Sequence, residues 1–85
     1  MVTIELFGAA RLAAKREQFA VEARTVGEAL NALVSACPAL DAIVCDGQLS
    51  RHYAIALNGK HFTTDAARTL RDGDALVIVS AHAGG

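Results

Sequence analysis

The sequence has no tryptophan, a single proline and only two cysteines in 85 residues. It also lacks any block of like charge, since 8 basic side chains stand against 9 acidic ones and both kinds are spread along the chain. This balance gives no electrostatic reason to expect nucleic acid or an anionic membrane as a partner. No apolar run reaches membrane length and the N-terminus shows no signal pattern, so we expect a cytoplasmic protein.

The two cysteines, Cys37 and Cys45, stand in apolar surroundings. In a reducing compartment such residues usually act as small hydrophobic side chains and not as a disulfide. With His52 they could suggest a metal site, but no pair among them has the compact spacing of metal ligands. We therefore predict no structural disulfide and no bound metal ion.

The N-terminal quarter predicts a hairpin of two strands. Residues 2–7 alternate between apolar and other side chains as a half-buried strand does, and residues 17–23 alternate again. Between them, residues 8–16 predict a loop or a short helical turn. Two such strands joined in this way are typical of an antiparallel pair.

One long helix follows this hairpin. Thr25 and Glu28 have the spacing of a capping box, in which the Thr25 hydroxyl accepts from the Glu28 amide and the Glu28 side chain reaches back to the Thr25 amide. Apolar residues then recur on one helical face, and Pro38 discourages continuation. The helix is predicted over 26–36.

The C-terminal half predicts three strands. Residues 37–52 are mixed, with a turn of helix and then a loop at Asp46-Gly47. The nearly continuous apolar run at 53–58 suits a central strand covered on both faces, and Asn58-Gly59 predicts a tight hairpin with residues 60–62 pairing back.

The last strand is predicted at 75–80, after a connection over 64–70 that has room for one helical turn and a further turn at 71–74. The element order, β-β-α-β-β-β, predicts an α+β protein of the β-grasp, or ubiquitin-like, fold. We expect a mixed sheet of about four to five strands, with strands 2–7 and 75–80 as neighbours and one main helix on one face. Residues 1–80 form the predicted single domain, and residues 81–85 a flexible tail.

The tail is the predicted functional segment, and it consists of Ala81, His82, Ala83, Gly84 and Gly85. Fully extended, it would span roughly 15 to 18 Å, enough to thread a narrow channel in another protein. The two glycines lack a Cβ and would pass where a side chain would not. A partner enzyme could activate the Gly85 carboxylate by adenylyl transfer from ATP, and sulfide or a persulfide could then convert it to a thiocarboxylate.

The opening VTIELFG, the capped helix from Thr25 and the ending LRDGDALVIVSAHAGG resemble the bacterial sulfur-carrier proteins of the ubiquitin-like fold. This group includes the small subunit of molybdopterin synthase and the thiamine-pathway sulfur carrier. The resemblance implies a carrier that binds no cofactor, is adenylated and thiocarboxylated at Gly85, and donates sulfur in cofactor biosynthesis. The implied partners are a ubiquitin-activating-like adenylyltransferase that uses ATP, a persulfide sulfurtransferase and an acceptor synthase.

Within this group, residues 8–16 and 37–52 favour the molybdopterin synthase small subunit, whose acceptor is the large subunit of that synthase. The ending VSAHAGG departs from that subunit, so carriers for thiamine, cysteine or another metabolite stay open. Two other classes also stay open: a protein modifier that forms isopeptide bonds through Gly85, and a plain interaction domain.

No catalytic residue is predicted. His82 has no neighbour that would orient its imidazole, and nothing in the sequence brings Ser80, His82 and Asp74 together as a triad. Phe7 and Phe62 are candidates for an exposed apolar patch that contacts a partner, although packing in the core is the more usual place for each.

Overall fold

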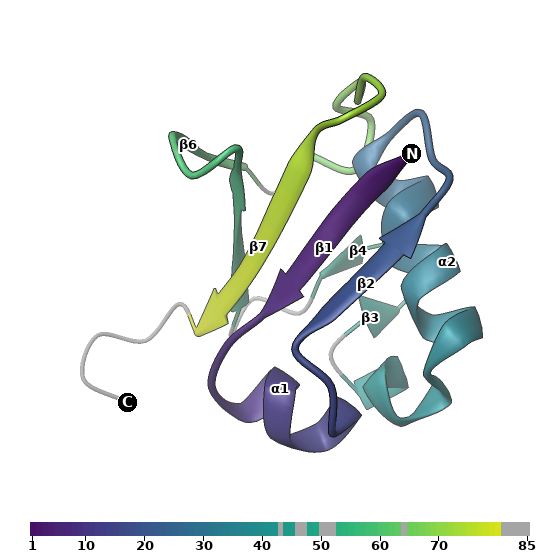
Figure 1. The fold of residues 1–85 in the computed structure, drawn as a ribbon, viewed down its shortest axis with the longest axis vertical. Coiled ribbons are helices and arrows are strands. Elements are labelled where there is room, and N and C mark those ends of the chain that lie inside the picture. The colour runs from purple at the N-terminus through teal and green to yellow at the C-terminus, as the bar shows by residue number, and fades with distance from the viewer. Residues whose placement is uncertain (43, 46–47, 50–52, 64, 81–85) are drawn as a thin grey trace.

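Five strands form one mixed sheet in the order β2-β1-β7-β5-β6, shown in Figure 1. The computed structural model describes residues 1–42, 44–45, 48–49, 53–63 and 65–80. β7 lies in the centre, parallel to β1 and antiparallel to β5, and the two outer pairs are antiparallel hairpins. The predicted β-grasp fold is confirmed. The strands of this sheet are β1 (Val2–Leu6), β2 (Gln18–Val21), β5 (Tyr53–Leu57), β6 (His61–Thr63) and β7 (Ala75–Ser80).

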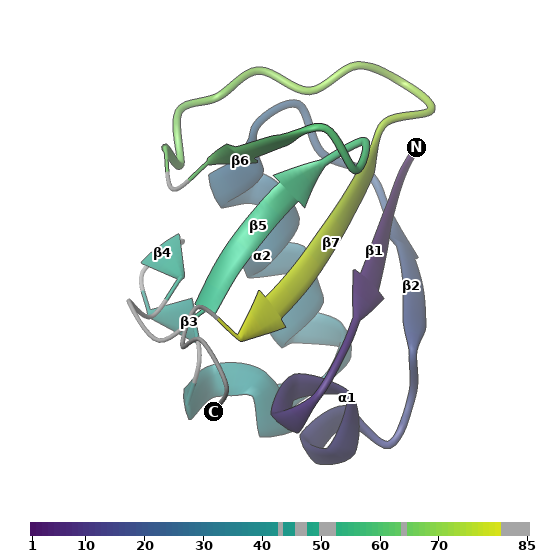
Figure 2. The same ribbon diagram turned by 90° about the vertical axis from the view of Figure 1, so that its left-hand side faces the viewer.

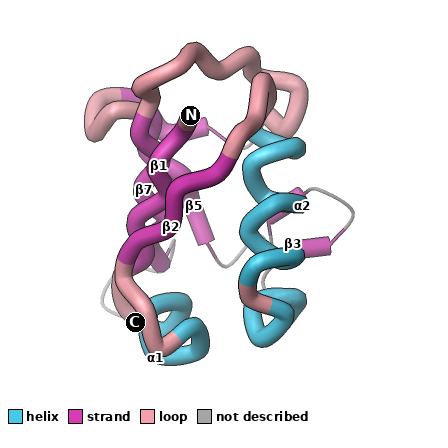
Figure 3. The backbone as a smooth tube through the Cα atoms, turned by 45° about the vertical axis from the view of Figure 1, so that its right-hand side comes forward, coloured by secondary structure: helices cyan, strands magenta, loops and turns pink. Residues whose placement is uncertain are grey.

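Helix α2 (Val26–Ala36) lies across one face of the sheet, as Figures 2 and 3 show from two sides. Its bounds match the predicted helix. Residues 8–16 contain a short helix, α1 (Ala9–Ala14), at the end of the sheet where β1 and β7 finish. None of the helices within the described ranges is long and apolar enough to cross a membrane.

The section after α2 holds more structure than the sequence predicted. The expected turn of helix is a 3-10 helix, η1 (Pro38–Ala42), and it is followed by a small antiparallel pair, β3 (Val44–Cys45) and β4 (Gln48–Leu49). Strands of two residues are too short to show an alternating pattern, which is why this pair was not predicted. The predicted loop at Asp46-Gly47 lies outside the described residues.

The start of α2 is capped, but with one difference from the predicted capping box. The Thr25 hydroxyl accepts a hydrogen bond from the Glu28 amide at 3.2 Å, as expected. The Glu28 carboxylate, however, accepts from the Arg24 amide at 3.0 Å and not from that of Thr25. The Glu28 side chain therefore caps the amide one residue before the one that the capping box predicts.

The connection before β7 packs against this same helix end. The carbonyls of Arg68 and Ala66 accept from the amides of Val26 and Gly27, at 3.0 and 2.8 Å. The first amides of a helix have no partner within the helix, so these carbonyls satisfy them. The helical turn for which 64–70 had room is absent from 65–70, where the structure has turns and extended backbone.

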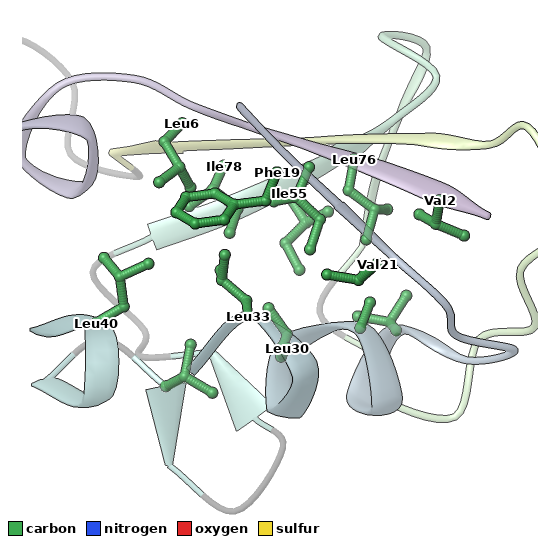
Figure 4. Packing of buried hydrophobic residues seen from close by; sticks show 14 of the residues in the cluster. Val2, Leu6, Phe19, Val21, Leu30, Leu33, Leu40, Ile55, Leu76 and Ile78 are labelled. Atoms are coloured by element: carbon green, nitrogen blue, oxygen red, sulfur yellow. The ribbon is translucent and has the colours of Figure 1, made fainter. Parts of the chain in front are cut away.

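The core lies between the sheet and α2, as Figure 4 shows. Every second residue of β1 and β7 points into it, since strand side chains alternate between faces. Leu30 and Leu33 of α2 pack against them, and Leu40 of η1 lies at one end of the layer. The largest fully buried side chains are Val2, Ile4, Leu6, Val26, Leu30, Leu33, Leu40, Ile55, Leu76 and Ile78.

Among the described residues no helix lies on the opposite face of the sheet, so the strand that was predicted at 53–58 is covered by a helix on one face and not on both. The strand that forms there, β5, alternates between large side chains facing α2, such as Ile55 and Leu57, and the alanines Ala54 and Ala56 on the other face. The run looked uniformly apolar because alanine is apolar, and a side chain this small needs no covering helix: Ala56 is only 9% exposed on this face.

Candidate functional site

The described part of the chain ends in the middle of the sheet, at the end of β7. β7 is paired with β1 from Ala75 to Ile78 and with β5 from Leu76 to Ser80. Near its end the Phe7 amide donates to the Ile78 carbonyl at 3.1 Å. The predicted tail and its Gly85 carboxylate, residues 81–85, lie outside the described residues. The sheet thus holds the chain up to Ser80, the residue directly before the tail.

The start of β7 is held by a polar cluster that joins two turns. The Asn58 side chain donates to an Asp74 carboxylate oxygen at 3.2 Å and accepts from the Ala75 amide at 2.9 Å. The other Asp74 oxygen accepts from the Arg71 amide at 2.8 Å. These hydrogen bonds, with that from the Arg71 amide first, hold the pKa of Asp74 below its usual value, because they favour the ionised carboxylate.

The N-terminus closes the same turn. The Met1 amino group forms an ion pair with Asp72, and the Gly73 amide donates to the Met1 carbonyl at 2.9 Å. Gly73 has φ +93°, a backbone conformation that other residues rarely adopt. Both strands that lead toward the tail, β1 and β7, are thereby fixed at their starting ends.

The side of the sheet opposite α2 carries no helix among the described residues, and we call it the outer face. Cross-strand partners share a face, so the pairings give its central row as Phe62, Ala56, Val77, Glu5 and Gln18. Apart from Glu5 the row carries no charge. The remaining described members are Thr3, Phe7, Ala20, Ala54, Ala75 and Val79.

The structure brings both aromatic candidates to the surface. Phe62 is 72% exposed and Phe7 is 46% exposed, so the usual expectation of core packing is wrong for each. Phe62 pairs with Ala56 on the outer face, and Phe7 lines a hollow there together with Glu5 and Gln18. They do not touch: three strand spacings of about 4.8 Å separate β6 from β1. The apolar side chains between them are small.

The hollow beside Phe7 has a volume of about 120 Å³ and two carboxylates in its lining, Glu5 and Glu17. Glu17 already forms an ion pair with Arg11 of α1 at 3.2 Å. For Glu5 no ion pair is present among the described residues. A side chain entering this hollow would meet an aromatic ring and a carboxylate at once.

The residues considered for a catalytic triad or a metal site do not come together among the described residues. Asp74 and Ser80 stand at opposite ends of β7, roughly 20 Å apart at about 3.3 Å per residue, so they cannot belong to one triad. Cys37 is half-buried and packs against the core, as a small hydrophobic side chain would. His52, His82 and the side chain of Cys45 lie outside the described residues.

A family model described as the ThiS family matches residues 4–85, which is nearly the whole chain. The chain belongs to this family of ubiquitin-like sulfur carriers. Among curated proteins, no sequence relative matches the chain.

Several solved structures are similar to this chain. It is 30% identical to SAMP1 from Haloferax volcanii, with a TM-score of 0.83 and coverage of 99% of this chain and 98% of that one. It is 27% identical to a chain in the complex of subunits 1 and 2 of molybdopterin-converting factor from Helicobacter pylori, with a TM-score of 0.67 and coverage of 99% and 97%. A chain of the BexX/CysO complex from Amycolatopsis orientalis shares the fold, at 23% identity, a TM-score of 0.82 and full coverage of both chains.

Sequence reasoning singled out the two aromatic residues but missed the outer face that carries them, and the predicted tail stays a prediction. The available signal was the alternation of large and small side chains in β5 and β7, where Ile55, Leu57, Leu76 and Ile78 alternate with alanine or valine. A strand with its larger side chains on one face buries that face more deeply. Glu5 was visible as the polar member of β1.

Proposed function

We propose that the chain is a sulfur-carrier protein whose cargo site is the carboxylate of Gly85. The observation that carries this proposal is the match of the ThiS family model through Gly84 and Gly85. The fold supports it, because the central strand β7 leads directly into the segment that ends with these two glycines. In this proposal the globular domain, residues 1–80, is the part that partner enzymes bind, and it supplies no catalytic residue.

The chemistry needs activation, since a free carboxylate is a poor electrophile. One Gly85 oxygen attacks the α-phosphorus of ATP on a partner adenylyltransferase, and pyrophosphate leaves. Sulfide then attacks the acyl carbon and displaces AMP, which gives the thiocarboxylate directly. If a persulfide on a sulfurtransferase attacks instead, the product is an acyl disulfide, which a thiol must cleave to release the thiocarboxylate. The chain itself needs no bound cofactor for these steps.

The outer face is the surface through which we expect partners to hold the body. Phe7 and Phe62 offer exposed aromatic area, and the small side chains between them leave a flat surface for close approach. This surface borders the strand that leads to the tail, so a partner that covers it lies where it would receive residues 81–85. Because activation uses ATP, we expect the reaction in the cytoplasm.

The acceptor that we favour is a molybdopterin synthase large subunit. The Helicobacter pylori relative was solved as a complex of the two subunits of molybdopterin-converting factor, and it aligns with nearly all of this chain. Carriers for thiamine, cysteine or another metabolite are the alternatives of the same class.

A second candidate function is protein modification through an isopeptide bond from Gly85. The similarity that favours it is that to SAMP1, because a solved structure at 30% identity describes its protein as small archaeal modifier protein 1. An activated Gly85 acyl group can react with a lysine amine as well as with sulfide. The two functions share the adenylation step and differ in the nucleophile.

The test is intact mass spectrometry after incubation with the cognate adenylyltransferase, ATP and a sulfur source. We expect the adenylate first and then the thiocarboxylate, and a variant that lacks Gly84 and Gly85 should form neither. An unmodified wild-type chain under these conditions would overturn the proposal. If the shortened variant still supports the cellular function, the chain is an interaction domain instead.

The modifier function is tested in the cell. A tagged chain is followed in lysates under denaturing conditions, with the variant lacking Gly84 and Gly85 as control. Conjugates that appear only with the intact chain would support modification, and their absence in a strain that forms thiocarboxylate would leave sulfur transfer as the function.

A further inference from the structure

Within strands β1, β2, β5, β6 and β7, the outer face carries one ionisable side chain among its described residues. Its other members, defined above, are apolar or uncharged, so the Glu5 carboxylate is a single negative charge on an otherwise neutral surface. Glu5 is half-buried, and its cross-strand neighbours are Val77 on one side and Gln18 on the other. A partner that covers this face would therefore take the carboxylate out of water.

An uncompensated charge in such an interface is costly, which makes it a device for selecting partners. Burying an ionised carboxylate without a counter-charge is unfavourable, whereas a facing cation offsets that cost and fixes the register of the two surfaces. The surroundings suit a cationic side chain. The hollow of about 120 Å³ beside Glu5 is also lined by Phe7 and Gln18, so a cation there could meet an aromatic ring and an amide oxygen.

Other positions supply no such charge within the described part of the chain. Glu17 at the rim of the hollow is engaged by Arg11 at 3.2 Å. The basic residues Arg11, Lys15 and Arg16 line a separate groove beside α1, and Arg16 lies over the Phe19 ring at 4.7 Å. Among the described residues, Glu5 is thus the charged side chain that a partner bound to the outer face has to neutralise.

We propose that Glu5 selects the partner enzyme by pairing with an arginine or lysine that projects from an apolar surface of that enzyme into the hollow beside Phe7. The proposal rests on the proposed function, since the occupant is the adenylyltransferase that activates Gly85. Glu5 acts as a specificity residue for docking, and it takes no part in the chemistry at the carboxylate.

The negative charge of Glu5 also favours a basic protein surface over other binding partners. A second copy that packed its outer face symmetrically on the first would bring two Glu5 carboxylates toward each other, which like-charge repulsion disfavours. A nucleic acid or an anionic lipid surface would be repelled by the same side chain. A protein with a basic side chain among apolar ones is the occupant whose charge fits.

The experiment measures binding of the fluorescently labelled chain to the cognate adenylyltransferase at low and high salt. We expect Glu5→Gln to weaken binding by about threefold to tenfold and Glu5→Arg by more than about tenfold. The wild-type affinity should fall as salt rises, and Glu5→Gln should reduce that salt dependence. A charge reversal of the facing basic residue on the enzyme should restore binding of Glu5→Arg.

Glu22→Gln is the matched control, because Glu22 is an exposed glutamate just beyond β2, at the end of the sheet away from the tail. We expect its binding to equal the wild type, and thermal unfolding should show that all variants are folded. Wild-type affinity of Glu5→Arg, or equal losses for the Glu5 and Glu22 variants, would overturn the inference, as would self-association of the chain through this face. If Gly85 is adenylated while Glu5 proves irrelevant, only the docking inference fails; if Gly85 is never adenylated, the proposed function fails.

Discussion

Asn58 joins two parts of the chain that are sixteen residues apart. Its backbone has φ +54°, the left-handed conformation that the hairpin turn before β6 requires, and its side chain binds both Asp74 and the Ala75 amide. Asparagine tolerates this conformation better than most residues. One residue therefore sets the turn and also anchors the beginning of the central strand.

These two roles of Asn58 can be separated by substitution. Asn58→Gly keeps the positive φ and removes both side-chain hydrogen bonds, which should lower the free energy of unfolding by about 1 to 2 kcal/mol. Asn58→Ala also places a Cβ in the left-handed conformation, which should cost about 1 kcal/mol more. Urea unfolding of both variants measures the difference. Equal stability of Asn58→Gly and the wild type would show that the hydrogen bonds contribute nothing.

Asp74 makes the same cluster sensitive to acid. Its pKa is lowered in the folded protein, so ionised Asp74 adds stability above the unfolded-state pKa of about 3.9, and this stability is lost as the pH falls through the folded-state pKa. Asp74→Asn should therefore be less stable than the wild type at neutral pH, and the gap should narrow at about pH 3. Urea unfolding at both pH values checks this.

The control for Asp74 is Asp41→Asn, since Asp41 is exposed in η1. We expect its stability difference from the wild type to be small at neutral pH. A gap between Asp74→Asn and the wild type that stays constant down to pH 3 would contradict the assigned role of the carboxylate.

Helix α2 shows how a local sequence signal positions an entire layer. The Thr25 hydroxyl satisfies one amide of the first turn, and loop carbonyls satisfy two others, so the helix begins at a defined place over the sheet. Thr25→Ala should lower the free energy of unfolding by about 1 kcal/mol. Thr25→Ser keeps the capping hydroxyl and should retain most of the wild-type stability. Chemical denaturation compares them, and a loss as large for serine as for alanine would assign the effect to packing of the methyl group.

Elements with a local signature were predicted well, and those without one were not. The cap and apolar face gave α2 its correct bounds, and Asn58-Gly59 gave the hairpin between β5 and β6. The 44–49 pair has strands of two residues, so no periodicity marks it. The exposure of Phe7 and Phe62 depends on which strands are neighbours and which face α2 covers, and neither is encoded near those residues.

The first and last strands, β1 and β7, lie side by side at the centre of the fold. β1 and β7 are paired in parallel, so the first and last strands support each other, and the strand that leads to the tail has neighbours on both sides. Strand pairing therefore holds the chain in the sheet up to Ser80. In the proposed function one surface binds a partner while residues 81–85 carry the reactive group, so we expect the two to be separable by mutation.

The exposed aromatic residue on β6 gives the sharpest separation of docking from stability. Phe62 is 72% exposed, so Phe62→Ser should change the free energy of unfolding by less than about 0.5 kcal/mol. If the outer face binds the adenylyltransferase, the same substitution should weaken that binding by about tenfold or more, because large aromatic side chains dominate interface energies. Leu12→Ser is the matched control, since Leu12 is 79% exposed on α1 and away from the outer face. Equal binding losses for the two variants would mean that general surface hydrophobicity drives the association and that the outer face has no special part in it.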